Sequence, residues 1–180
     1  MPSISIRKIE EMKDVAYRPE EIRIPPEEAA YWVIRNPGRN LTIFPFYRLG
    51  GGEYPKTYGH FHKPPYAENY QVLYGKAGFL LQKMVPRKAR GKGRIAEIRL
   101  KILGPGERFT VPAGFGHIML NMGDDYVVTM DDHDPRHFDN DYGPVKEARG
   151  LGYFIVEDKG RWKAIPNSNF TDLPSLEQDV

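Results

Sequence analysis

From residue 41 onward, hydrophobic and polar residues alternate in short runs that glycine and proline separate. Alternation with a period of two is typical of strands with one buried face, whereas a helix repeats every three to four residues. The pattern predicts strands near 41–48, 54–62, 69–74, 77–84, 95–102, 108–111, 117–121, 125–131, 151–156 and 161–165. Short strands at regular spacing are typical of an all-β sandwich or barrel.

The two ends of the chain follow other patterns. Residues 1–25 show weak periodicity and are expected to cover the outside of the barrel. The prolines and acids of Pro25–Glu28 lead into an apolar run, which predicts a short N-terminal helix over 25–34. Asn36–Gly38 would end this helix. The tail 166–180 is polar and is expected to be loosely held.

Composition is typical of one globular domain. The 180 residues fit a single domain over 1–180, with the barrel core at about 40–160. The 26 basic and 24 acidic residues leave a net charge of +2, so no bulk field favours nucleic acid or an anionic membrane. Cysteine is absent from the sequence, which excludes disulfides and thiolate chemistry.

Two further segments bear on location and partners. The first residues lack a basic and then apolar signal pattern, and no apolar run reaches membrane-spanning length, so we expect a soluble, cytoplasmic protein. Residues 86–94 are rich in lysine and arginine, which could attract phosphate or nucleic acid. No aromatic residue stands among them to stack on bases, so a solvated hairpin tip without a nucleic-acid partner is the favoured interpretation.

The candidate chemistry is concentrated in residues 57–75. His60 and His62 are two residues apart, and in a strand such residues share a face. Glu68 follows six residues after His62, and a carboxylate from the next strand can complete a third corner. Imidazole together with carboxylate suits Fe, Mn, Zn, Ni or Co, so the sequence predicts a metal site.

Two spaced motifs extend this prediction. The first is H-x-H-x5-E-x6-G from His60 to Gly75, and the second is G-x5-P-x-G-x2-H-x3-N from Gly106 to Asn121. Together they resemble the paired motifs of the cupin superfamily, a small β-barrel of double-stranded β-helix or jelly-roll type. The resemblance implies that the metal ligands are His60, His62, Glu68 and His117.

The flanking residues narrow the family. Lys56–His62, Glu68–Leu73, Gly78–Gln82, Pro112–His117, Asn121–Asp124 and Asp141–Gly143 resemble the cupin-type glucose-6-phosphate isomerases known from archaea. The resemblance covers roughly residues 40–160. It implies interconversion of glucose 6-phosphate and fructose 6-phosphate in glycolysis or gluconeogenesis. It also implies a homodimer with one divalent ion per subunit, with Fe²⁺ favoured and Mn²⁺, Zn²⁺ or Ni²⁺ as alternatives.

The same resemblance implies which residues meet the substrate. Thr57, Gly59, Tyr70 and Tyr142 would line the pocket, with Thr57 and Tyr142 holding the phosphate. Glu68 and Tyr70 are the candidate catalytic residues. Moving a carbonyl between C1 and C2 needs either a proton carried through an enediol or a direct hydride shift, and the sequence does not choose between them. Mannose 6-phosphate also stays open as a substrate.

Two positions raise questions about this assignment. Strict alternation would point Thr57 away from His60, so its phosphate role requires a bulge at Gly59. Asn140 occupies the place where the family carries a histidine thought to help open the sugar ring. His137, three residues away, is the candidate replacement.

Two other functions fit the same motifs. An Fe(II)-dependent dioxygenase would use the same donors, but would need an apolar cavity in place of a phosphate site. A non-catalytic cupin would bind a sugar phosphate without converting it.

Overall fold

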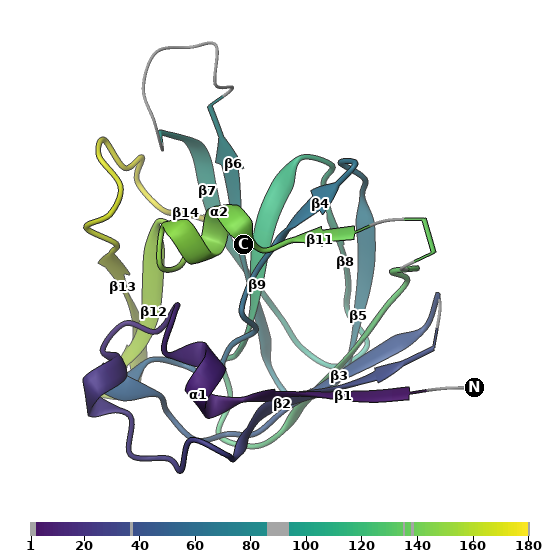
Figure 1. Cartoon of the computed structure of the whole chain (residues 1–180), viewed down its shortest axis with the longest axis horizontal. Helices are drawn as coiled ribbons and strands as arrows, with labels where there is room; N and C mark the ends of the chain where they lie inside the picture. Colours follow the sequence, from purple (N-terminus) through teal and green to yellow (C-terminus); the bar gives the residue numbers. More distant parts are fainter. Residues whose placement is uncertain (1–2, 37, 86–93, 135, 138, 180) are drawn as a thin grey trace.

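The computed structural model of the chain describes residues 3–36, 38–85, 94–134, 136–137 and 139–179. The strands in this part are β1 (Ser3–Lys8), β2 (Ala29–Arg35), β3 (Asn40–Phe44), β4 (Phe61–Lys63), β5 (Glu68–Tyr74), β6 (Ala77–Met84), β7 (Ile95–Leu103), β8 (Arg108–Val111), β9 (Phe115–Asn121), β10 (Val127–Asp131), β11 (Asp139–Asp141), β12 (Tyr153–Asp158), β13 (Arg161–Pro166) and β14 (Glu177–Asp179). The described α-helices are α1 (Ile9–Met12) and α2 (Gly143–Glu147), and neither could span a membrane. The prediction of an all-β protein is confirmed (Figure 1).

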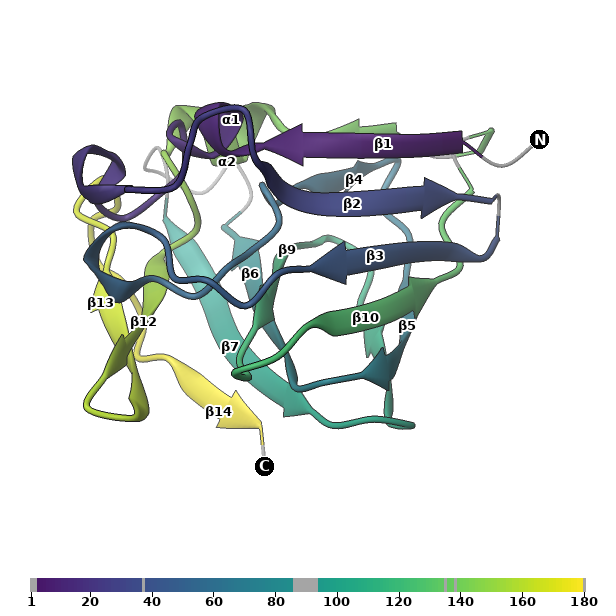
Figure 2. The same cartoon turned by 90° about the horizontal axis from the view of Figure 1, so that it is seen from below.

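Two main sheets form the walls of the barrel. One has the strand order β1-β2-β3-β10-β5-β8, and the other has the order β14-β7-β6-β9. Figure 2 shows β1, β2, β3 and β10 side by side across the first wall. The short β4-β11 pair and an isolated bridge between His60 and His117 join segments from different parts of the chain. The candidate metal ligands therefore lie where the walls approach one another.

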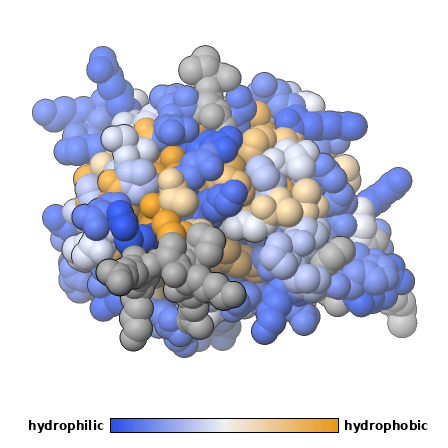
Figure 3. Space-filling model, turned by 90° about the horizontal axis from the view of Figure 1, so that it is seen from above, coloured by the Kyte–Doolittle hydropathy of each residue, from blue (hydrophilic) through white to orange (hydrophobic). Residues whose placement is uncertain are grey.

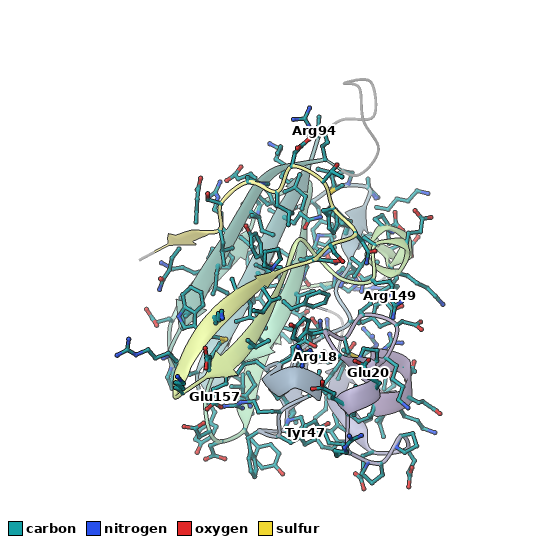
Figure 4. All side chains as sticks on the ribbon, turned by 90° about the vertical axis from the view of Figure 1, so that its left-hand side faces the viewer. Arg18, Glu20, Tyr47, Arg94, Arg149 and Glu157 are labelled. Carbon is teal, nitrogen blue, oxygen red and sulfur yellow. The ribbon has the colours of Figure 1, made fainter. Side chains whose placement is uncertain are left out.

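Two strands of the second wall, β6 and β9, are buried on both faces. Every residue of β9, and all of β6 except its last two, is buried. The β12-β13 hairpin covers the outside of this wall, and the Gly152 N–H donates to Gln82 Oε1 at 2.7 Å (Figure 1). In Figure 4, Glu157 of β12 lies at the opposite end of the molecule from Arg94.

The tail 166–180, which the sequence predicts to be loosely held, runs along this wall. Asn167 and Phe170 are buried, and the side chain of Leu173 packs against the hydrophobic core. β14 then pairs in parallel with β7. Although the tail is mostly polar, a few of its side chains pack against the core and its last residues form a strand.

The helix predicted over 25–34 is wrong. Ala29–Arg35 instead form β2, which pairs with β1 on one side and with β3 on the other. Tyr31, Trp32, Val33 and Ile34 have the aromatic and β-branched side chains that favour strands, and sheet pairing outweighs the helix-start signal of the prolines and acids. The short N-terminal helix of the fold is α1, which lies earlier in the chain.

The first residues form part of the barrel wall. β1 is an edge strand of the six-stranded sheet, and α1 and the turn after it bury Ile9, Met12 and Val15. A buried ion pair between Lys56 and Glu53 holds the N-terminal segment in place. Lys56 Nζ donates to Glu53 Oε1 and to the Val15 carbonyl, both at 2.6 Å. The N-terminal segment is thus tied to the residues that lead into the candidate metal site.

The basic segment 86–94 lies outside the described residues except for Arg94. Arg94 Nε lies 3.8 Å from Asp172 Oδ2, and both side chains are more than half exposed. The face seen in Figure 3 carries mainly hydrophilic residues around its margin, with hydrophobic residues gathered toward its middle.

Candidate metal centre and substrate cavity

Three histidines and one carboxylate meet at one point inside the barrel. Donor atoms of His60, His62, Glu68 and His117 all lie within 4.8 Å of one another. His62 Nε2 lies 3.2 Å from His60 Nε2 and 3.0 Å from Glu68 Oε2. His117 Nε2 lies 3.4 Å from the same carboxylate oxygen.

These separations fit one metal ion. Nitrogen and oxygen donors bind such ions at about 2.1 Å, so two donors on one ion lie roughly 3.0 to 3.4 Å apart for bond angles between octahedral and tetrahedral. The observed distances of 3.0, 3.2 and 3.4 Å fall in this range. The residues present therefore fit a divalent ion, and they are the ones that the sequence motifs predicted.

Backbone pairing and two glycines bring the donors together. His60 and His117 exchange both backbone hydrogen bonds, at 3.2 and 3.0 Å. Gly116 packs against the Phe61 ring so closely that a Cβ there would overlap it. Gly59 has φ +86°, a conformation that favours glycine, and a Cβ there would overlap Ile118. Two strands can approach only because both positions lack a side chain.

Protonation favours metal binding. Burial lowers the pKa of His60 well below its usual value and that of His117 to about 4. Burial alone would raise the pKa of Glu68, but its hydrogen bond with His62 and the nearby His117 and His62 lower it overall. His60 and His117 therefore offer neutral imidazoles and Glu68 an ionised carboxylate, which are the forms that bind metal ions. His62 Nδ1 lies 3.3 Å from the Tyr66 carbonyl, and a proton on this nitrogen leaves Nε2 free to bind.

Tyr70 stands directly beside these donors. Its hydroxyl donates to Glu68 Oε2 at 2.8 Å and lies 3.0 Å from His117 Nε2. Burial and the Glu68 charge raise the pKa of Tyr70 well above its usual value, so the hydroxyl keeps its proton at neutral pH. Tyr70 can therefore act as a hydrogen-bond donor at the metal edge.

A cavity of about 250 Å³ opens onto this centre. Its walls come from the inner face of the six-stranded sheet, from the segment before β4 and from β11. The lining residues are Ser5, Ile6, Arg7, Glu11, Tyr31, Val33, Arg35, Asn40, Thr42, Thr57, Gly59, His60, Glu68, Tyr70, Met119, Asp131, His133, Asn140 and Tyr142. The substrate-binding residues implied by the sequence, Thr57, Gly59, Tyr70 and Tyr142, thus all face one space.

The expected change of direction at Gly59 is present. Residues 57–59 form no regular strand, and the positive φ of Gly59 breaks the alternation, so that Thr57 and His60 line the same cavity. Thr57 Oγ1 accepts a hydrogen bond from the Met119 N–H at 3.0 Å. Its own hydroxyl hydrogen is therefore available to a ligand.

The two residues linked with ring opening lie in different places. Asn140 lines the cavity, and its Nδ2 donates to the Tyr142 hydroxyl at 3.2 Å. The buried Asn140 Oδ1 has no hydrogen-bond partner among the described residues. His137 is not among the lining residues, and its side chain is 67% exposed beside Asp134. The structure thus gives no support to His137 as the replacement.

Sequence analysis missed the cavity residues of the N-terminal segment. Arg7 Nη1 donates to Glu11 at 2.6 Å, and Arg7 Nε donates to the Tyr31 hydroxyl at 3.3 Å. The Arg7 guanidinium also lies 5.2 and 5.7 Å from the ring centres of Tyr58 and Tyr142. The alternating letters of Ser3–Arg7 were the available signal, because alternation is typical of a strand with one face toward the interior.

An all-β barrel that gathers imidazole and carboxylate donors beside a polar cavity defines a metal-binding cupin. A protein-family model described as glucose-6-phosphate isomerase (GPI) matches residues 8–171. Because this match covers most of the chain, the chain belongs to the glucose-6-phosphate isomerase family.

Comparison with solved structures finds other cupins at low identity. The CENP-C cupin domain of Drosophila melanogaster is 13% identical, with a TM-score of 0.38, over 56% of this chain and 65% of that chain. Oxalate decarboxylase of Bacillus subtilis, described with Mn(II) centres, is 18% identical, with a TM-score of 0.45. The match covers 66% of this chain and 30% of that chain. This chain thus spans less than two thirds of either one. The search of curated proteins found no match.

Proposed function

We propose that this protein interconverts glucose 6-phosphate and fructose 6-phosphate with a divalent ion held by His60, His62, Glu68 and His117. The observation that carries the proposal is the shared cavity, which is lined by His60 and Glu68 of this cluster and by Arg7, Thr57 and Tyr142. Family membership supports the same reaction. By the same likeness we propose a cytoplasmic homodimer.

The wall residues suit a sugar phosphate. Arg7 supplies a positive charge whose orientation is fixed by Glu11 and Tyr31. The Thr57 hydroxyl can add a donor to a phosphate oxygen, and Tyr142 lines the same cavity. A cavity with this charge and polarity favours a phosphosugar over the apolar substrate that a dioxygenase would need.

The residues at the centre suit a carbonyl shift between C1 and C2. When bound, a divalent ion polarises the oxygens at these carbons as a Lewis acid. The Tyr70 hydroxyl donates to the Glu68 carboxylate, which holds Tyr70 in place, and its oxygen can accept a hydrogen bond from a substrate hydroxyl. Glu68 can also exchange a proton in the enediol route, whereas the hydride route needs no such base. Both routes stay open.

Metal removal and replacement test the function. The protein is stripped with a chelator and reloaded singly with Fe(II), Mn(II), Zn(II) or Ni(II), and glucose 6-phosphate formed from fructose 6-phosphate is followed with a coupled dehydrogenase. We expect turnover to disappear on stripping and to return with at least one ion, with Fe(II) the first candidate. Tight ion binding without turnover by any metal would overturn the proposal. Oxygen consumption would then indicate a dioxygenase. Binding of sugar phosphate without turnover would indicate a non-catalytic cupin.

Replacement of Arg7 tests the phosphate contact. In Arg7→Gln we expect KM for the sugar phosphate to rise about tenfold or more, because a charge-assisted hydrogen bond contributes roughly 1.5 to 3 kcal/mol. Turnover at saturation should change only a few-fold. Inorganic phosphate should also become a weaker competitive inhibitor.

Lys8→Gln is the matched control for this prediction. Lys8 is the next residue of β1, its side chain is 51% exposed, and it does not line the cavity. Its replacement should leave KM unchanged. Equal KM values for Arg7→Gln and the parent protein would place the phosphate elsewhere.

A further inference from the structure

Several groups of the cavity wall that can exchange a proton are already engaged, and one of them is His133, whose Nδ1 is hydrogen-bonded with the Tyr66 hydroxyl. Glu11 accepts hydrogen bonds from Arg7 and from the Lys8 N–H. Tyr70 donates to Glu68. Asn140 has an amide, which cannot take up a proton at neutral pH. Asp131, at the end of β10, remains as a carboxyl group of the cavity wall outside the metal cluster.

Asp131 is held in one orientation by its neighbours. Its Oδ1 accepts hydrogen bonds from Asn40 Nδ2 at 2.7 Å and from the His133 N–H at 3.1 Å. Asn40 Nδ2 also donates to the His133 carbonyl at 2.9 Å, which fixes the amide itself. The second oxygen, Oδ2, has no hydrogen-bond partner within the described part of the chain, and Asp131 is 7% exposed. One carboxyl oxygen is thus anchored while the other is left for a ligand.

The surroundings of Asp131 also suit proton exchange. Burial and the charge of Glu68 on β5 raise its pKa to about 7, whereas the hydrogen bonds from Asn40 and His133 act in the opposite direction. Asp132, the next residue, raises it further. Both the acid and the carboxylate are therefore populated near neutral pH, which is the condition for efficient acid–base catalysis.

We propose that Asp131 is the acid–base residue that opens the sugar ring of the substrate. The proposal rests on the phosphosugar isomerase function, because a hexose phosphate is mostly cyclic and its carbonyl must be released before C1 and C2 can react. Because Oδ1 is held by Asn40 and His133, Oδ2 is the oxygen of Asp131 that can exchange a proton with the substrate. His137, which is exposed outside the cavity, is not needed for this step.

The step balances with one carboxyl group. Asp131 Oδ2 takes the proton of the hydroxyl at the anomeric carbon. The electron pair of that O–H bond forms the second carbon–oxygen bond of the carbonyl as the bond from this carbon to the ring oxygen breaks. The same proton is then delivered to the ring oxygen, which leaves as a hydroxyl group. The carboxylate is regenerated and no co-reactant is consumed.

Asp131→Asn tests the step, because the amide keeps an oxygen to accept from Asn40 and cannot carry the proton. Exchange between the two anomers of glucose 6-phosphate is measured by NMR, and isomerisation by the coupled assay, both on the metal-loaded protein. We expect both rates to fall about a hundredfold, with metal content unchanged and KM within about threefold. Asp124→Asn is the matched control, since the side chain of this carboxylate is 99% exposed and does not line the cavity, and both rates should stay within twofold.

The outcomes separate this proposal from the function on which it rests. If the parent protein exchanges anomers and isomerises, and Asp131→Asn does both within twofold of it, only the ring-opening role is overturned. A raised KM with unchanged turnover would also overturn it, since Asp131 would then bind substrate without transferring a proton. If the parent protein itself does not isomerise with any metal, the proposed function fails first.

Discussion

Replacement of Lys56 by methionine is expected to lower the free energy of unfolding by about 3 to 5 kcal/mol, because it leaves a buried carboxylate without its cation. The side chains of Lys56 and Glu53 are only 3% and 0% exposed. Lys56 Nζ donates to Glu53 Oε1, and the Tyr17 N–H donates to Glu53 Oε2 at 2.9 Å. Methionine fills a similar volume, so the loss arises from the unpaired charge and from the freed Val15 carbonyl.

The stability lost in Lys56→Met, relative to the parent protein, should increase as the pH rises. Burial raises the pKa of Glu53, and the charge of Lys56 counteracts this rise. Without Lys56 the folded-state pKa rises further above the unfolded value, so the folded state binds a proton that the unfolded state has released. Stability contributed by that proton is lost as pH rises through the folded pKa. Chemical denaturation of Lys56→Met and of the parent protein at pH 5 and pH 8 should therefore show the larger difference at pH 8.

The double variant Glu53→Gln with Lys56→Met provides the control. It removes both charges and keeps an acceptor for the Tyr17 N–H, so it should recover most of the lost stability. A Lys56→Met protein as stable as its parent at both pH values would mean that the pair contributes no net stability.

Replacement of His62 by alanine is expected to lower metal-dependent turnover by roughly a thousandfold or more. His62 Nε2 lies within 3.2 Å of donor atoms on both His60 and Glu68. Its replacement by alanine would therefore remove one of the four proposed metal ligands. Lewis-acid stabilisation supplies several kcal/mol, and about 4 kcal/mol corresponds to roughly a thousandfold in rate. Metal content after dialysis and kcat/KM measure the effect.

His137→Ala is the matched control for His62. It removes an imidazole from an exposed position outside the cavity, and both metal content and turnover should stay near those of the parent. A His62→Ala protein that keeps its ion and turns over within tenfold of the parent would exclude His62 as a ligand. A large loss in His137→Ala would contradict its placement outside the site.

Sequence reasoning located the metal donors because their signal is local. His60 and His62 are two residues apart, and the spacings to Glu68 and to His117 resemble the paired cupin motifs, so four candidate ligands could be named without coordinates. The bulge needed at Gly59 was also foreseeable, since a glycine there is the simplest way to redirect Thr57.

The rest of the cavity depends on long-range pairing that local patterns do not encode. Arg7 reaches the site only because β1 adds to the edge of the sheet beside β2. Asp131 becomes a candidate only in the folded chain, where it is buried and accepts a hydrogen bond from Asn40 of a strand that is distant in the sequence. The helix predicted over 25–34 failed for the same reason, since neighbouring strands decided the backbone of Ala29–Arg35.

The position of β1 puts Arg7, one of the proposed phosphate-binding residues, on a part of the chain that is separable from the candidate metal donors. β1 pairs with β2 alone, whereas the metal donors all lie beyond residue 59. The buried residues that fix the N-terminal segment begin at Ile9, after the strand has ended. Trimming the first eight residues would therefore leave the metal cluster and the core anchors in place while removing Ser5 and Arg7 from the cavity. A synthetic peptide could add as a strand to the vacated sheet edge, so that the guanidinium of Arg7 could be supplied to the cavity by a separate molecule.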